Sequence, residues 1–330
     1  MNPGSSPGRT CPAHYGYSPR VFARAAELHA ETLYVVGGLY GNGPALDEIE
    51  RMAALESATL VFNGDFHWFD AEPDLFGEID RRVRAHTALR GNVETELAQP
   101  TDEAGCGCAY PDSVSDAEVT RSNAILARLR TASHTAARGD LPMHLVAQVG
   151  EARIGIVHGD AWSLAGWRFA HDALFSASQS EFDALFTEAR VDGFACSHTC
   201  LPALKVDMYE RFIINNGAAG MPNFQGSRAG LITRIAVMPL PTALTPQRVY
   251  GAEVAGIYVD ALRVDFDFAA WRAQFLEVWP QGSAAHVSYF ERIEQGPQFT
   301  VDQALGRVTS RSCIAPFPSP SVPLPRGEGS

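Results

Sequence analysis

Four residues that are far apart in the sequence are of types that commonly bind divalent metal ions. In chain order they are Asp65, Asn92, His158 and His198, and each has a glycine or a serine beside it. One carboxylate oxygen, one amide oxygen and two imidazole nitrogens form a donor set that suits a first-row divalent cation. The pattern therefore predicts a metal site, provided that the fold brings these four side chains together.

Each of the four residues comes just after a short apolar segment that is typical of a β-strand. The four segments are Thr59–Phe62, Ala88–Leu89, Ala152–Val157 and Gly193–Ala195. In an open α/β sheet, ligands bind beyond the carboxyl ends of the strands. The elements thus place the candidate ligands where such a fold keeps its functional residues.

The first part of the chain alternates strands with helices. We expect a helix over Pro19–Ala30, a strand over Thr32–Val36, and a helix over Pro44–Leu55 that has a proline in its first turn. After the strand at residues 59–62, the stretch Pro73–Ala85 is amphipathic and leads to Leu89. This β-α-β-α-β order predicts a layered α/β sheet.

The second half of the chain contains more hairpin-like β-structure and predicts a second sheet. A helix is expected over Asp116–Arg130, and helices again between Trp167 and Ala189. The expected strands are Met143–Val149, Ala152–Val157, Gly193–Ala195, Arg211–Ile214, Gly230–Val237, Tyr250–Val259 and Leu262–Phe268. A helix is expected to follow them, near Ala269–Val278.

Composition sets the broad class of protein. The 330 residues are 46% hydrophobic with a formal net charge of -12, which argues against binding to nucleic acid or an anionic membrane through overall charge. We expect a flexible N-terminus (1–18), one domain (19–312) and a disordered Pro/Ser/Gly-rich tail (313–330). The sequence shows no signal-peptide pattern or membrane-spanning run, and its six cysteines are too sparse for a disulfide scaffold, so we expect a cytoplasmic protein.

The order of the motifs resembles that of the calcineurin-like metallophosphoesterase superfamily, over roughly Thr32–Val237. The matching segments are Gly41–Leu46, Gly64-Asp65, Gly91-Asn92, His158-Gly159, Ser197-His198-Thr199 and Asn215-Asn216-Gly217. The resemblance implies an α/β fold, a four-layer αββα sandwich of two mixed β-sheets flanked by helices. It also implies hydrolysis of phosphate esters at a two-metal site.

Matched to the family, the ligands of one metal are complete and those of the other are altered. Asp65 matches the aspartate that bridges both ions, and Asn92, His158 and His198 match the remaining ligands of one ion. The ligands that bind only the other ion are replaced by Gly38, Tyr40 and Cys200. Because only a Cys200 thiolate among these three could still bind a metal such as zinc, we expect one divalent ion (Mn, Zn, Fe or Mg) rather than two.

Further residues are candidates for parts of the site. His67 would replace a lost ligand or donate a proton, since Val93 stands where many family members carry a histidine; the alternative is a structural role on its loop. Glu94 is expected to orient a ligand. For Cys106 and Cys108 we weigh thiolate ligation or a redox pair against two ordinary loop thiols, and favour the latter.

The expected function is metal-dependent hydrolysis of small phosphomonoesters or phosphodiesters by a metal-activated water. Asp65, Asn92, His158 and His198 would hold the ion, with Cys200 and His67 as further candidates. The alternative is a catalytically inactive relative that binds a phosphorylated ligand or a protein partner. A third interpretation has Cys200, with His67 or Cys108, rebuild the second metal site. Arg168 and Arg228 are candidates for phosphate contact, although surface salt bridges are the favoured role for both.

Overall fold

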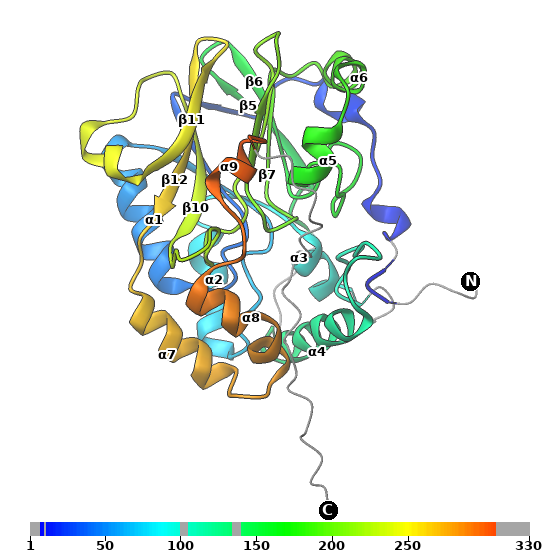
Figure 1. Cartoon of the computed structure of the whole chain (residues 1–330), viewed down its shortest axis with the longest axis vertical. Coiled ribbons are helices and arrows are strands. Elements are labelled where there is room, and N and C mark those ends of the chain that lie inside the picture. Colours follow the sequence, from blue (N-terminus) through cyan, green and yellow to red (C-terminus); the bar gives the residue numbers. More distant parts are fainter. Residues whose placement is uncertain (1–6, 10, 100–104, 134–139, 308–330) are drawn as a thin grey trace, which may run out of the picture.

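Two six-stranded β-sheets stack face to face at the centre of this computed structural model, which describes residues 7–9, 11–99, 105–133 and 140–307 (Figure 1). In the first sheet three parallel strands continue into three antiparallel ones. Its order is β11 (Arg248–Val254), β12 (Ile257–Val264), β10 (Gly230–Ala236), β2 (Thr32–Val36), β3 (Thr59–Asn63) and β4 (Thr87–Leu89).

The second sheet is also mixed, with antiparallel pairing at β5–β6 and β8–β9 and parallel pairing elsewhere. Its order is β1 (Leu28–Ala30), β5 (His144–Val149), β6 (Ala152–Val157), β7 (Gly193–Cys196), β9 (Phe212–Asn215) and β8 (Ala203–Val206). Both faces of each sheet are covered, so most strands are nearly continuous runs of buried residues.

Three apolar clusters account for the layers. Side chains such as Val35, Val61 and Ile154 fill the space between the two sheets. Alternate residues of the first sheet, such as Tyr34, point outward and pack against α1 (Gly43–Glu56) and α2 (Pro73–Val83). On the outer face of the second sheet, α5 (His171–Ser176) and α6 (Gln179–Ala189) bury their apolar sides. The expected αββα sandwich is therefore confirmed.

A further group of helices closes one end of the sandwich. In Figure 1, α4 (Asp116–Ala132), α7 (Phe268–Val278) and α8 (Ala284–Gln295) lie at the lower end of the molecule, beyond the carboxyl ends of the parallel strands. Their apolar faces meet in a separate cluster that is rich in aromatic side chains. The remaining short helices are α3 (Asn92–Leu97), α9 (Val301–Ala304) and the 3-10 segments Ala13–Tyr15, Pro19–Phe22 and Thr242–Gln247.

The helix predicted over Pro19–Ala30 is wrong. Only Pro19–Phe22 forms a 3-10 helix, capped by Ser18, and the chain then becomes strand β1, which pairs with β5. The alanines of this segment favour a helix, but burial of Phe22 against Phe194 and the free edge of the second sheet override that local preference.

The turn between the last two strands was also misplaced. The predicted strands 250–259 and 262–268 are instead 248–254 and 257–264, joined by Ala255 and Gly256. Both turn residues have positive φ, 50° and 75°, as a tight two-residue hairpin requires. The sequence prediction put the turn near Asp260, which lies buried in the middle of β12.

The second half of the chain contributes to both sheets rather than to the second alone. Strands β5 to β9 build the second sheet, whereas β10, β11 and β12 extend the first. The predicted tail, 313–330, lies outside the described residues, as do residues 1–6 of the N-terminal segment. Further along that segment, Tyr15 is fully buried. None of the helices in the described part of the chain is both long and apolar enough to cross a bilayer.

Candidate metal centre

The four candidate ligands meet at the end of the sandwich, where the two sheets lie next to each other. Asp65 follows β3 and Asn92 begins α3 directly after β4, both in the first sheet. His158 follows β6 and His198 follows β7, both in the second sheet. All four side chains are buried. The fold thus brings together the residues that the sequence singled out.

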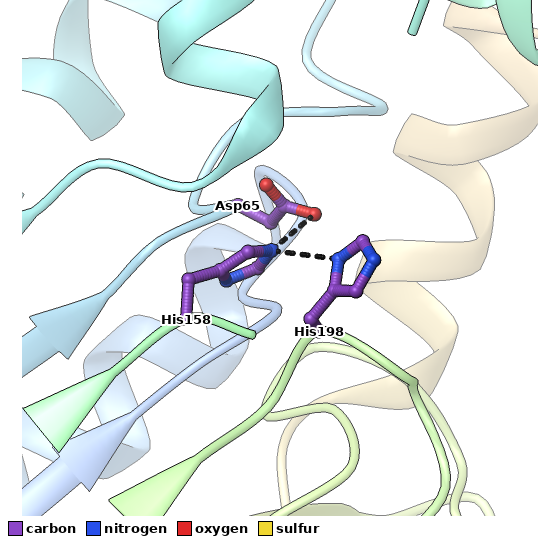
Figure 2. Close-up of side chains that lie close together, drawn as sticks. All are labelled: Asp65, His158 and His198. Atoms are coloured by element: carbon purple, nitrogen blue, oxygen red, sulfur yellow. Dashed lines mark hydrogen bonds and ion pairs between the residues drawn. The ribbon is translucent and has the colours of Figure 1, made fainter. Parts of the chain in front are cut away.

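One nitrogen of His158 lies at the centre of the group. Its Nε2 is 3.3 Å from Asp65 Oδ2 and 3.1 Å from His198 Nδ1 (Figure 2). The same Nε2 is 3.0 Å from Asn92 Oδ1. Donor atoms that share one metal at bonds of about 2.1 Å are spaced about 3.0–3.4 Å apart when they are adjacent. One ligand atom each from Asp65, His158 and His198 can be chosen so that all lie within 4.8 Å of one another. The spacing therefore fits a common ion.

Backbone carbonyls fix the direction of three of these side chains. His158 Nδ1 is 3.0 Å from the carbonyl oxygen of Asn63, and His198 Nε2 is 3.1 Å from that of Cys108. Asn92 Nδ2 donates to the carbonyl of Cys106 at 2.9 Å. Because a carbonyl can only accept, each of these nitrogens carries the hydrogen. The opposite atoms, His158 Nε2, His198 Nδ1 and Asn92 Oδ1, therefore present lone pairs to the centre.

The centre is consequently a group of four acceptors with no hydrogen of its own. Such a group requires a cation, either a metal ion or a proton on His158. Burial opposes protonation of His158, but Asp65 and Glu94 outweigh it and raise its pKa. Burial and the neighbouring His158 lower the pKa of His198 to about 3. The donor set is the kind that zinc, manganese or iron takes, so the residues present fit a divalent ion.

The carboxylate of Asp65 is kept ionised by the same neighbours. Burial opposes its ionisation, but the charge of a protonated His158, the hydrogen bond with His158 and the N–H of Val93 hold its pKa below the usual range. Val93 donates to Asp65 Oδ1 at 3.2 Å, which leaves Oδ2 directed at the centre. Asp65 therefore brings a negative charge to a site that must bind a cation.

Glu94 holds the loop that carries Asp65. Its carboxylate accepts the N–H groups of Asp65 at 2.9 Å, Gly91 at 2.8 Å and Phe66 at 3.1 Å. Asp65 itself has φ of 51°, in the left-handed region that costs most residues free energy. Glu94 stabilises this conformation, which agrees with the role expected of it.

Two glycines allow the close approach. A Cβ on Gly64 would lie 2.5 Å from the nitrogen of Gly91 and 2.7 Å from His158 Nδ1. A Cβ on Gly91 would lie 2.3 Å from Asp65 Oδ1. Neither clash can be relieved by turning a flexible side chain, because backbone or ligand atoms are involved. This is the physical reason for a glycine in each motif.

The positions matched to the other metal are filled differently. The hydroxyl of Tyr40 is 2.8 Å from the sulfur of Cys200, and a Cβ on Gly38 would lie 2.9 Å from the Tyr40 ring. Burial raises the pKa of both the phenol and the thiol, so both groups are neutral at ordinary pH. Cys200 is not part of the donor group found among the described residues. The ring of Tyr40 thus fills the space that a side chain at position 38 would need.

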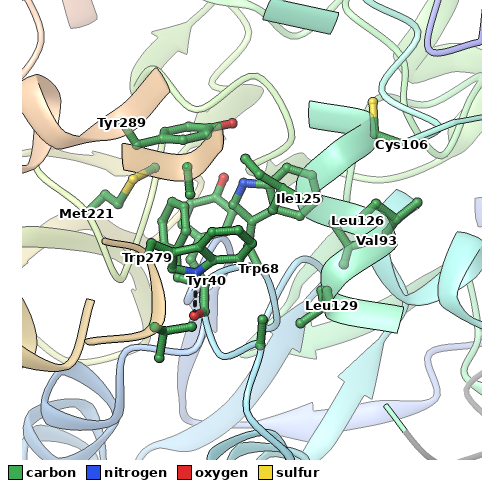
Figure 3. Close-up of a cluster of buried hydrophobic side chains, with 14 of the residues drawn as sticks. Tyr40, Trp68, Val93, Cys106, Ile125, Leu126, Leu129, Met221, Trp279 and Tyr289 are labelled. Carbon is green, nitrogen blue, oxygen red and sulfur yellow. Dashed lines mark hydrogen bonds between the residues drawn. The ribbon is translucent and has the colours of Figure 1, made fainter. Parts of the chain in front are cut away.

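A small cavity lies over both halves of the site. Its volume is about 30 Å³, room for only about one or two water molecules. Figure 3 shows Tyr40, Trp68 and Tyr289 close together in the aromatic cluster above it, with α4 on one side. The complete lining is Tyr40, Asp65, Trp68, Asn92, Val93, Cys108, Tyr110, Trp167, His198, Thr199, Cys200 and Tyr289.

His67 points away from the centre. Its ring stacks on Phe76 with the centroids 3.7 Å apart, its Nδ1 is 2.6 Å from Asp70 Oδ2, and its Nε2 is 3.5 Å from Asp80 Oδ1. It does not line the cavity. This geometry corresponds to the structural alternative for His67 rather than to a ligand or proton donor.

The other candidates also lie apart from the donor group. Arg168 stacks on Trp162, with its Cζ 4.3 Å from the ring centroid, and Arg228 pairs with Glu294 at 3.3 Å. The thiols of Cys106 and Cys108 are buried, and neither belongs to the donor group of the described residues.

What the sequence interpretation missed is the role of the loop that contains the two cysteines. Its carbonyls at Cys106 and Cys108, not its sulfurs, orient Asn92 and His198. The glycines at 105 and 107, both with positive φ, were the available signal, because they indicate a backbone that turns sharply.

Comparison with known proteins gives a likeness of fold. No protein-family model matches the chain, and no curated protein matches it. Among solved structures, a hypothetical protein from Pyrococcus horikoshii OT3 is 16% identical, with a TM-score of 0.54, over 82% of this chain and 100% of that one.

Two further structures align less well. A metallophosphoesterase from Sphaerobacter thermophilus is 17% identical over 81% of this chain and 99% of that one, with a TM-score of 0.47. A predicted phosphoesterase from Streptococcus pneumoniae TIGR4 is 15% identical over 72% and 91%, with a TM-score of 0.37. At these identities the likeness concerns the fold alone. The chain shares a fold of two mixed β-sheets flanked by helices with the Pyrococcus horikoshii protein, at low sequence identity.

Proposed function

We propose that this protein is a metal-dependent phosphoesterase that works with a single divalent ion. The observation that carries the proposal is the group of four converging acceptors, Asp65 Oδ2, Asn92 Oδ1, His158 Nε2 and His198 Nδ1. Hydrogen bonds on the far side of Asn92 and of both histidines point these lone pairs inward. Such an arrangement is costly to bury without a cation, and it is held in place by the surrounding chain.

Some residues of the site would bind the ion, and others hold those ligands in position. Asp65, Asn92, His158 and His198 would hold the ion, and Glu94 keeps the Asp65 loop in its strained conformation. When bound, the ion would acidify a water molecule and polarise a phosphoryl oxygen. Trp68, Tyr110 and other aromatic residues of the cavity wall exclude bulk water, which strengthens electrostatic interactions inside.

The cavity must open before a substrate can enter. Pockets that hold small organic ligands have volumes of about 300–1,000 Å³, whereas this cavity is far smaller. Its wall includes Trp68 and, from α8, Tyr289. Their movement would admit a small phosphorylated substrate. The tight enclosure also favours the second candidate function, a non-catalytic protein in which the ion is structural and the fold binds a phosphorylated ligand or a protein partner.

Hydrolysis assays separate the two candidates. Purified protein loaded with manganese, zinc, iron or magnesium is offered p-nitrophenyl phosphate and bis-p-nitrophenyl phosphate. The proposal expects release of p-nitrophenol above the level of an Asp65→Asn variant prepared in the same way. If the protein binds an ion but hydrolyses neither compound faster than Asp65→Asn, the non-catalytic function is favoured.

A further inference from the structure

A buried arginine without a carboxylate partner lies beside the altered half of the site. Arg292 on α8 is 1% exposed. Its Nε donates to the carbonyl of Pro222 at 3.1 Å and its Nη2 to that of Cys200 at 2.7 Å. Its Nη1 is buried without a hydrogen-bond partner in the described part of the chain. No carboxylate of the described residues forms an ion pair with it.

Arg234, the other fully buried arginine among the described residues, has the carboxylate partners that Arg292 lacks. Arg234 is 0% exposed and forms ion pairs with Glu56 at 2.8 Å and Asp260 at 3.2 Å. A buried charge is normally compensated in this way, because removing it from water is costly. Arg292 retains its positive charge with only two carbonyls to accept from it. Its charge is therefore available to an anion.

Arg292 does not itself line the cavity but lies directly behind its wall. Cys200, whose carbonyl it contacts, lines the cavity, and so does Tyr289, which precedes Arg292 by one turn of α8. The guanidinium thus lies on the same side as the Tyr40–Cys200 pair, where the resemblance places the missing ion. It comes from a segment that the resemblance does not cover.

We propose that Arg292 is an anion-binding residue that supplies, beside Cys200, part of the positive charge that a second metal ion would have supplied. Its Nη1 would donate to a phosphoryl oxygen once the aromatic wall opens. The inference rests on the proposed function, since it assumes that a phosphorylated compound enters this cavity. A purely structural arginine would tie the loops of Pro222 and Cys200 together and do nothing else.

Binding of inorganic phosphate tests this role directly. We would measure the Kd by isothermal titration calorimetry for wild-type protein, Arg292→Met and Arg292→Lys, each with its bound ion and each after chelation. A charge-assisted hydrogen bond contributes enough for its loss to weaken binding about 10- to 100-fold. We expect that loss for Arg292→Met, in both metal states, and a smaller loss for Arg292→Lys. Arg228→Met is the matched control, because Arg228 pairs with Glu294 at the surface.

A second variant covers the case in which Arg292→Met does not fold. Arg292→Gln keeps an N–H for the Cys200 carbonyl but removes the charge, and it should weaken phosphate binding to a similar degree. Unchanged phosphate affinity in a folded Arg292→Met or Arg292→Gln overturns the proposal, as does wild-type protein that binds no phosphate. Phosphate binding that depends on Arg292 without any hydrolysis would uphold this role and refute the proposed activity alone.

Discussion

The two halves of the site share one cavity but differ in what they require. The His158 half presents lone pairs from Asp65, Asn92, His158 and His198 to one point, and only a cation can satisfy them. In the other half Tyr40 and Cys200 are neutral and satisfy each other.

The two halves differ in the groups that orient their side chains as much as in the side chains themselves. His158 and His198 face inward with lone pairs because Asn63 and Cys108 accept their hydrogens on the far side. Cys200 directs its sulfur at Tyr40 and at the carbonyl of His198. A soft donor is present, but it already has partners and keeps its proton.

The strongest test of the contrast is to remove the one carboxylate from the His158 half. Asp65→Asn keeps a residue that tolerates positive φ, so the loop should persist. Loss of orienting partners alone costs about 10- to 100-fold in metal affinity, so we expect loss of this ligand to cost more than about 100-fold. Metal titration by calorimetry measures the change.

A matched control uses another buried aspartate. Asp160→Asn alters a carboxylate that accepts the N–H groups of Trp162 and Arg168 and lies outside the donor group. We expect it to lower the free energy of unfolding but to leave metal affinity unchanged. Equal affinities of Asp65→Asn and wild-type protein would contradict the assignment of Asp65.

The next effect should come from the residue that supports Asp65. In Glu94→Gln the amide NH₂ faces either the N–H groups of Asp65 and Gly91, which share Oε2, or the N–H of Phe66 at Oε1, so at least one N–H loses its acceptor. We expect metal affinity to fall about 10- to 100-fold and the free energy of unfolding to fall by about 1–3 kcal/mol. Calorimetry and chemical denaturation measure the two quantities.

Glu118→Gln is the control for the capping function of a carboxylate. Glu118 accepts the N–H of Ser115 at the start of α4, far from the donor group in sequence. It should lose stability without losing metal affinity. If both variants affect metal affinity equally, Glu94 has no special role in orienting Asp65.

The pH dependence of metal binding gives a moderate effect. In the metal-free protein the pKa of His158 is raised, so its proton stabilises the folded state below the ordinary pKa of about 6.5 and this contribution is lost as pH rises through the folded pKa. An ion must displace that proton. Metal affinity should therefore fall about tenfold per pH unit below the raised pKa.

Calorimetry in buffers of different ionisation enthalpy measures the released proton, at pH values on both sides of about 6.5. Below about pH 6.5 we expect release of about one proton for each ion that binds. Affinity that does not change with pH would mean that no proton on His158 competes with the ion.

The smallest effect is expected in the other half. Cys200→Ser exchanges a neutral thiol for a neutral hydroxyl that still has Tyr40 as a partner. Metal content should not change, and the free energy of unfolding should change by about 1 kcal/mol or less. Loss of an ion measured by plasma mass spectrometry would instead make Cys200 a ligand.

Much of the donor group was predictable because it depends on short local patterns. Asp65, Asn92, His158 and His198 each follow a strand, and the ends of parallel strands meet in space. The layers of the fold were predictable too, because the alternation of strands and helices is also a local pattern. The order of the four residues and the glycines beside them predicted a fold with two sheets.

What could not be predicted depends on contacts between distant segments. The helix expected at residues 19–30 gave way to strand β1 because the edge of the second sheet was available at β5. The side on which His67 lies is set by Asp80 and Phe76 on α2. Nothing in the sequence around Arg292 predicts its place beside the site, because that place depends on its contact with the distant loop of Cys200.

The number of ions bound by wild-type protein tests the central claim most directly. Protein purified without chelator and dialysed against excess manganese or zinc is analysed by plasma mass spectrometry, with Asp65→Asn treated identically. The contrast between the two halves predicts one ion per chain in wild-type protein and none in Asp65→Asn. Two ions per chain, or none, would contradict it.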